Sequence, residues 1–174
     1  MPEREKGEKM KLLVIYGTID SGKTHTMYLV LSRLLEKGAK IVGDLYGAQR
    51  ILPHQEVMAT PTRIPDFRTI VEIEGKKVML LSAGDFIGYS YWGFNAHIEY
   101  AIKINVDYVV CCARSYNQTN SVHRELRNKY SGEMLANEDW FRVIKTNNPN
   151  WLEERDQIAE KVVNKLLYYI DLEK

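Results

Sequence analysis

The sequence predicts an α/β protein with a three-layer arrangement: a mainly parallel central sheet with one antiparallel hairpin strand, and helices on both faces. Short, continuous apolar runs are typical of strands that are buried on both faces of a parallel sheet. Amphipathic helical segments alternate with these runs, as in a sheet built from right-handed crossovers. Two consecutive segments within residues 67–81 instead flank the turn Glu74-Gly75, which favours a hairpin.

Each predicted element has its own local signal. The predicted strands are apolar or alternating runs at 12–16, 40–44, 67–73, 78–81, 108–112 and 140–144. The predicted helices carry apolar side chains at helical spacing and lie at 23–37, 95–104, 119–130 and from residue 150 onward. Asn95 and Asn150 are expected N-caps, and Glu153 lies three residues after Asn150 as in a capping box. The stretch 45–66 contains three prolines and no clear period, so it is expected to be functional or to contain a short unrecognised element.

Composition and charge exclude several classes of protein. The formal net charge of +1 gives no basic field for nucleic acid or an anionic membrane. No apolar run approaches the roughly 20 residues that span a bilayer, and the charged start lacks the apolar stretch of a secretory signal. Cys111 and Cys112 are neighbours in a strand and point to opposite faces, so they are expected to be reduced thiols. We therefore expect a flexible charged leader at 1–10, a single domain at 11–174 and a cytoplasmic location.

The strongest functional signal is the pattern Gly-x-x-x-x-Gly-Lys-Thr at 17–24, between the first strand and the first helix. Gly17 and Gly22 are expected to let the backbone curl so that successive N–H groups face inward and bind an anion. The helix N-terminus adds the positive end of its dipole. Lys23 can bridge phosphate oxygens, and the Thr24 hydroxyl can ligate Mg²⁺. The expected nucleotide-binding residues of this turn are Gly17, Thr18, Ile19, Asp20, Ser21, Gly22, Lys23, Thr24 and His25.

This strand–turn–helix unit resembles the P-loop NTPase superfamily. The resemblance covers residues 12–37 closely and the rest of the chain as a pattern of alternating elements. It implies that the protein binds ATP or GTP together with magnesium, with Lys23 on the phosphates as a catalytic residue and Thr24 on the metal.

P-loop proteins usually place an acidic residue for magnesium at the end of a neighbouring apolar strand. The best candidate follows the strand 78–81, at residues 82–85 (Ser-Ala-Gly-Asp). Together with the preceding hairpin, this segment resembles the part of small GTPases that ends in Asp-Thr-Ala-Gly-Gln. The resemblance assigns Gly84 to the γ-phosphate and puts Asp85 where a glutamine positions water, while Leu81 stands in place of the magnesium-linked aspartate. Asp85 is therefore the predicted second metal and catalytic residue.

Asp44, at the end of the second strand, is the alternative carboxylate. Beyond Asp85, residues 86–94 hold five aromatic residues and two glycines. Such a segment suits an element that responds to the γ-phosphate, a stacking surface for a small-molecule acceptor, a docking site for a protein partner, or a small satellite core.

The expected nucleotide is ATP, with GTP as the less favoured alternative. Residues 113–117 stand where small GTPases carry Asn-Lys-x-Asp, and they lack both the lysine and the aspartate that read guanine. Arg114 is expected to stack on adenine or point to phosphate, and Thr146 and Asn147 to lie near the base.

Three functions stay open at this point. The preferred one is hydrolysis of the triphosphate. A kinase is the first alternative, with Arg124 and Arg127 as lid arginines over the phosphates and Asp44 as the base on the acceptor side. The second alternative is a nucleotide switch that docks a protein partner at residues 86–94.

Overall fold

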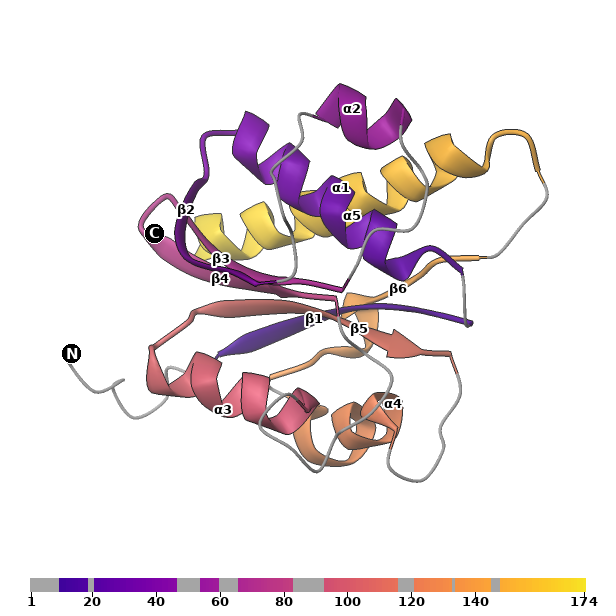
Figure 1. Ribbon diagram of the computed structural model, residues 1–174. Coiled ribbons are helices and arrows are strands. Elements are labelled where there is room, and N and C mark those ends of the chain that lie inside the picture. Colours follow the sequence, from indigo (N-terminus) through magenta and orange to yellow (C-terminus); the bar gives the residue numbers. More distant parts are fainter. Residues whose placement is uncertain are drawn as a thin grey trace.

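The computed structural model describes residues 10–18, 21–46, 54–59, 66–82, 93–115, 121–132, 134–144 and 148–174, with the backbone alone for 44–46. It is an α/β fold built on a six-stranded mixed sheet (Figure 1). The strands are β1 (Lys11–Gly17), β2 (Lys40–Tyr46), β3 (Arg68–Ile73), β4 (Lys76–Leu81), β5 (Tyr108–Arg114) and β6 (Trp140–Arg142). The helices are α1 (Lys23–Glu36), α2 (His54–Ala59), α3 (Phe94–Lys103), α4 (Val122–Glu125) and α5 (Trp151–Leu172), with a π-helical turn at Leu126–Tyr130 and a 3₁₀ turn at Asn137–Asp139.

The strand order is β2-β3-β4-β5-β1-β6. β1 runs parallel to β5 and β6, and β4 runs parallel to β5. β3 is antiparallel to both of its neighbours, which confirms the predicted antiparallel strand. The turn between β3 and β4 has positive φ angles at Glu74 (51°) and Gly75 (78°), the geometry that a tight hairpin requires.

The strand order corrects one expectation. β4, the strand with the Ser-Ala-Gly-Asp segment, is not a neighbour of β1, because β5 lies between them. β2 is an edge strand, and three strands (β3, β4 and β5) lie between it and β1. Asp44 lies within β2 rather than at its end, since the strand continues to Tyr46.

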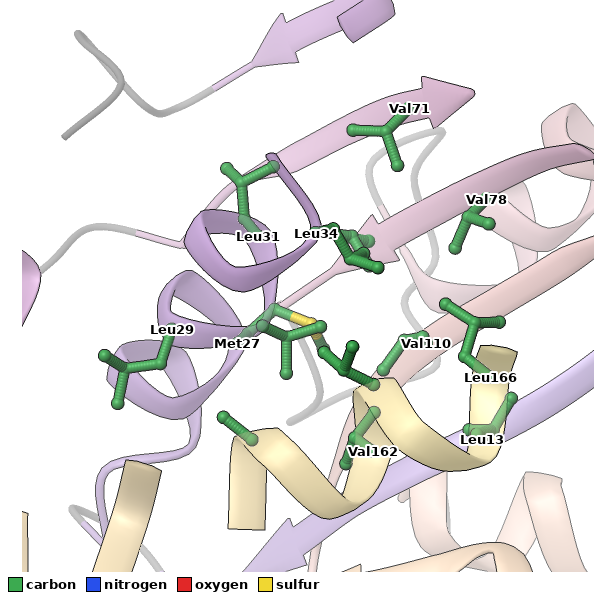
Figure 2. Close-up of a cluster of buried hydrophobic side chains, with 14 of the residues drawn as sticks. Leu13, Met27, Leu29, Leu31, Leu34, Val71, Val78, Val110, Val162 and Leu166 are labelled. Atoms are coloured by element: carbon green, nitrogen blue, oxygen red, sulfur yellow. The ribbon is translucent and has the colours of Figure 1, made fainter. Parts of the chain in front are cut away.

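Helices cover both faces of the sheet. α1, α2 and α5 lie over one face, and α3 and α4 lie over the other (Figure 1). The alternation of a strand divides neighbouring residues between two hydrophobic clusters: Cys112 belongs to the α1 and α5 side and Cys111 to the α3 and α4 side, both as free thiols. Figure 2 shows the first cluster, in which Met27 of α1 and Val162 of α5 meet Val110 of the sheet.

Of the two predicted N-caps, the structure confirms the position of Asn150 but not that of Asn95. Asn95 lies inside the first turn of α3, whose N-cap is Gly93, and the Asn95 side-chain oxygen is buried without a hydrogen-bond partner among the described residues. Asn150 is the N-cap of α5, but its side chain makes no capping hydrogen bond. The Asn148 side chain, just before the helix, accepts a hydrogen bond from the Asn150 amide and donates one to Glu154 in the first turn, each at 3.0 Å.

Met10, the last residue of the expected leader, belongs to the hydrophobic core. Its side chain is buried against the cluster beneath α3, just before β1 begins. Residues 1–9 lie outside the described residues. The short element expected within 45–66 is α2, which packs on α1 through the buried side chain of Val57.

Candidate functional site

The candidate site lies at the edge of the sheet where the parallel strands end. Gly17 of β1 is level with Arg114 of β5, and Leu81 of β4 pairs with Cys111 of β5. Because β3 is antiparallel, its amino end reaches the same edge, where Arg68 pairs with Leu81. This edge therefore collects residues that follow the parallel strands and also residues that precede β3.

The two glycines of the loop have different roles. Gly22, the N-cap of α1, has a φ of 96°, a conformation that favours glycine. Gly17 ends β1 without a positive φ, and its requirement is steric: a Cβ atom there would lie 2.5 Å from the Ser21 hydroxyl oxygen and from the Val143 carbonyl oxygen. The predicted need for backbone curling therefore applies to Gly22, and Gly17 is needed because chain segments pack closely around it.

The N-terminus of α1 is open to an anion. Gly22 has no side chain to cap it, and the first turn carries no acidic residue. The positive end of the helix dipole therefore has no acidic side chain of the first turn and no capping side chain of Gly22 beside it. The Ser21 hydroxyl beside them is buried, and its oxygen has no hydrogen-bond partner among the described residues.

Lys23 folds back over the loop that precedes it. Its Nζ atom donates to the carbonyl oxygens of Gly17 at 3.1 Å and Thr18 at 2.9 Å. These bonds hold the ammonium group at the mouth of the loop, beside the helix N-terminus. The structure thus brings the side chain of Lys23 together with two of the predicted loop residues, Gly17 and Thr18.

Thr24 is joined to a carboxylate that sequence analysis did not single out. Its hydroxyl donates to Oδ1 of Asp66 at 2.8 Å, across 42 positions of the chain. The Ser82 hydroxyl, at the carboxyl end of β4, lies 3.3 Å from the same oxygen. Ser82 also accepts a hydrogen bond from the Phe67 amide at 2.7 Å, which fixes the backbone next to Asp66. The end of β4 thus contributes to the site by holding Asp66.

The Thr24 and Asp66 oxygens suit Mg²⁺, which needs few protein ligands, better than a metal ion that needs several side-chain ligands. Among the described residues, no group of three or more His, Cys, Asp or Glu side chains could hold a metal ion. Mg²⁺ commonly binds through one or two protein oxygens and takes its other ligands from water and phosphate. The Thr24 hydroxyl and the Asp66 carboxylate offer such a pair of oxygens.

His25 links the loop helix to α2 and α5. Its Nε2 atom lies 3.0 Å from the Val57 carbonyl oxygen and therefore carries the proton, which leaves Nδ1 to accept from Arg155 Nη1 at 3.4 Å. Burial lowers the pKa of His25, and the nearby Arg155 charge lowers it further, against the opposing effect of the Val57 hydrogen bond. His25 is therefore a neutral connector next to the predicted site.

The basic residues predicted around the site lie in two different places. Arg114 ends β5 beside Gly17. Arg127 stacks on the Trp140 ring, with Cζ 3.9 Å from the ring centroid, and its Nε atom donates to His123 at 3.4 Å. His123 in turn donates from Nδ1 to the Arg114 carbonyl oxygen at 2.6 Å. Arg124 lies on the exposed side of α4, on the α3 and α4 face of the sheet.

Several predicted site residues fall outside the described residues. They are Ile19, Asp20, Gly84, Asp85, residues 86–92, Thr146 and Asn147. For Asp44 the structure describes the backbone, which belongs to the edge strand β2.

Asp66 and Arg155 are the residues that sequence reasoning missed. The search for acids considered the carboxyl ends of strands, whereas Asp66 precedes the amino end of an antiparallel strand that reaches the same edge. The predicted hairpin contained the necessary signal, because a strand that runs against its neighbours brings its amino end to the ligand edge. Arg155 had no comparable signal, since it occupies the first turns of a long charged helix.

A scan against protein-family models finds no matching family, and searches of curated proteins and of solved structures find no match. Within the described part of the chain, no helix is both long and apolar enough to cross a membrane.

Proposed function

We propose that this protein binds a nucleoside triphosphate together with magnesium, with ATP preferred, and hydrolyses it. The observation that carries the proposal is the loop at 17–24. Its uncapped helix N-terminus, the Lys23 ammonium at its mouth and the Thr24 hydroxyl paired with Asp66 gather the groups that a metal-bound polyphosphate needs.

Each group has a distinct role in this proposal. The N–H groups at the start of α1 and the Lys23 ammonium contact phosphate oxygens. The Thr24 hydroxyl and the Asp66 carboxylate would hold Mg²⁺, which supplies positive charge against the phosphates. Asp66 takes the place of the carboxylate that the sequence assigned to Asp85 or Asp44, because it is the acid in hydrogen-bond contact with Thr24.

Hydrolysis is preferred over phosphoryl transfer to another acceptor because of Arg127. As a kinase lid, Arg127 would close over the phosphates, but its guanidinium packs on Trp140 and donates to His123. Trp140 belongs to β6 and its ring lies with the cluster beneath α4, on the face of the sheet opposite α1. The preference for ATP still rests on the missing Asn-Lys-x-Asp signature at 113–117.

Titration calorimetry tests the binding proposal. Wild-type protein is titrated with ATP and GTP, each with magnesium and with EDTA, and compared with Lys23→Ala. The expected result is magnesium-assisted ATP binding that Lys23→Ala weakens strongly without lowering the thermal midpoint, because the Lys23 amine bonds to loop carbonyls rather than to the core. Lys37→Ala, an exposed lysine at the far end of the same helix, is the matched control and should bind like wild type.

Equal ATP affinity in wild type and Lys23→Ala would overturn the assignment of the loop. GTP binding at least tenfold tighter than ATP would overturn the nucleotide preference. Phosphate release from ATP, measured without any added acceptor, tests hydrolysis, and binding without release would favour the switch alternative. A ligand at a hundredfold excess over its dissociation constant stabilises a protein by about 2.7 kcal/mol, so a thermal-shift panel gives an independent measurement.

A further inference from the structure

Arg155 lies against the phosphate-binding loop although it is far from it in the sequence. α1 and α5 pack side by side on the same face of the sheet (Figure 1). In the first turns of α5, the Arg155 guanidinium touches Gly22, so that a Cβ atom added to Gly22 would collide with it. The guanidinium group therefore lies directly against Gly22, the N-cap residue of α1.

The charge of this arginine is not balanced by a carboxylate in the described part of the chain. Its contacts there are with the His25 ring nitrogen at 3.4 Å and with the Trp151 ring, whose centroid lies 4.5 Å from Cζ. Both partners are uncharged, because His25 is held neutral by burial. Burial also lowers the pKa of Arg155, with no acidic group acting in the opposite direction. A half-buried cation without a counterion is costly, and an anion at the site would offset that cost.

The neighbouring Arg33 shows the contrast. It lies on α1, is partly buried, and is paired with Asp156 through two hydrogen bonds of 2.9 Å and 2.7 Å. Asp156 is the next residue after Arg155, yet its carboxylate is directed to Arg33 and His54. The other adjacent acid, Glu154, accepts a hydrogen bond from Asn148, so both acids next to Arg155 in the sequence have other partners.

Two contacts keep the guanidinium oriented. The Trp151 indole supports one face of the planar group, and His25 Nδ1 accepts from one of its N–H groups. A guanidinium has five N–H donors, so most remain available to another acceptor. Stacking on an aromatic ring and donating to phosphate are compatible roles, since they use the face and the edge of the group respectively.

Arg155 and Asp66 contact different residues at the start of α1: Arg155 lies against Gly22 and His25, whereas Asp66 accepts a hydrogen bond from Thr24. Asp66 precedes β3, which lies beyond β5 and β4 on one side, whereas α5 follows β6 on the other. The Thr24–Asp66 pair marks the side for the metal and the terminal phosphates. On that assignment, the Arg155 guanidinium, which contacts Gly22 and His25 instead, is left for the nucleoside end of the phosphate chain.

We propose that Arg155 is a second cationic contact of the nucleotide site, which binds the phosphate nearest the nucleoside. The inference rests on the proposed function, because it needs a nucleotide in the loop. It adds a binding residue from α5 that the loop motif does not contain. It also gives Gly22 a role beyond backbone conformation, because a Cβ atom there would displace the guanidinium from its present position.

The test compares Arg155→Met with Lys161→Met by titration calorimetry against ATP and ADP in the presence of magnesium. Arg155→Met keeps an apolar stem near Trp151 and removes the charge. Lys161 is an exposed residue of the same helix, so Lys161→Met makes the same charge change away from the loop. Arg155→Gln is a second variant with a planar polar end and no charge, for use if the methionine variant does not fold. Circular dichroism checks the fold of each variant.

The expected result is a loss of affinity of about tenfold or more for both ATP and ADP in Arg155→Met, because a charge-assisted contact to phosphate is lost. ATP and ADP should lose affinity by the same factor, since both carry the phosphate nearest the nucleoside. Lys161→Met should bind both as wild type does. Wild-type affinity in a folded Arg155 variant would overturn the proposal, and a loss confined to ATP would place the contact at the terminal phosphate and also overturn it.

The outcome is distinguishable from failure of the proposed function. If wild-type protein binds neither ATP nor GTP, the loop assignment fails and the Arg155 proposal fails with it. If wild type binds ATP and Lys23→Ala does not, the function stands, and the Arg155 variants alone decide the inference.

Discussion

Asp156 joins three helices above the sheet, and replacing it with asparagine should destabilise the protein. Its two oxygens accept from Arg33 Nε and Nη2 at 2.9 Å and 2.7 Å, which ties α5 to α1. His54 Nε2, from α2, lies 2.8 Å from Asp156 Oδ1. The Arg33 and Asp156 side chains are 21% and 15% exposed, so solvent screens this pair less than a surface ion pair. Asparagine offers one acceptor oxygen in place of the bidentate carboxylate.

The expected loss is about 2 kcal/mol, between the values for exposed ion pairs and for fully buried charge-assisted hydrogen bonds. For a chain of this size, that loss lowers the thermal midpoint by about 4–8 °C. Urea denaturation at neutral pH measures it. Glu160→Gln is the matched control, because Glu160 lies one helical turn further on α5, is exposed and undergoes the same change of charge. The control should stay within about 0.5 kcal/mol of wild type.

The loss of stability in Asp156→Asn should depend on pH. Burial by itself raises the pKa of Asp156, but the hydrogen bonds from Arg33 and His54 outweigh burial, and the net effect is a lowered pKa. A carboxyl group with a lowered pKa stabilises the fold above its unfolded-state value of about 3.9, and this contribution is lost as pH falls through the folded-state value. The difference between wild type and Asp156→Asn should therefore be smaller near pH 3 than at pH 7. An unfolding free energy equal to that of Glu160→Gln at pH 7, or a difference that persists unchanged near pH 3, would refute the reasoning.

The remaining predictions concern the site. Asp66→Asn should reduce ATP affinity in magnesium more than in EDTA, because it removes the carboxylate charge while keeping an oxygen acceptor; equal losses in calorimetry would argue against a metal role. Gly22→Ala should destabilise the fold, because its φ is 96°, and weaken ATP binding, because the added Cβ displaces the Arg155 guanidinium. Gly38→Ala has a similar φ of 98° but open space around it, so it should affect stability alone. Arg127→Ala should lower stability by about 1 kcal/mol through the lost contact with Trp140 and leave phosphate release unchanged. A large drop in acceptor-stimulated turnover in that variant would instead favour the kinase alternative.

Local signals in the sequence were sufficient for the elements and for the loop. The turn at Glu74-Gly75 needed only the backbone preferences of two residues, and the structure confirms it with positive φ at both. The opposite orientation of Cys111 and Cys112 follows from strand geometry alone. Lys23 is only six positions from Gly17, so the short connecting segment keeps its side chain close to the Gly17 carbonyl oxygen. Each of these features is decided by neighbours in the chain.

The hydrogen bonds at the start of α5 and the order of the strands could not be predicted from local sequence signals. Asn150 and Glu153 fit a capping box by spacing, but Asn148 supplies the side-chain hydrogen bonds, since cap geometry depends on how the preceding loop enters the helix. The insertion of β5 between β1 and β4 leaves no trace in the periodicity of either strand, because all three are apolar runs of similar length.

By itself, the sequence determined the alternation of strands and helices, the hairpin and the position of the glycine-rich loop at 17–24 between β1 and α1. Only the tertiary structure decided which distant groups meet at that loop: Asp66, 42 positions from Thr24, and Arg155, 130 positions from His25. The physical reason is the range of the interactions. Backbone preferences and side-chain periodicity act within a turn or a strand, whereas the meeting of distant residues follows from strand order, from the direction of β3 and from the packing of α5 against α1.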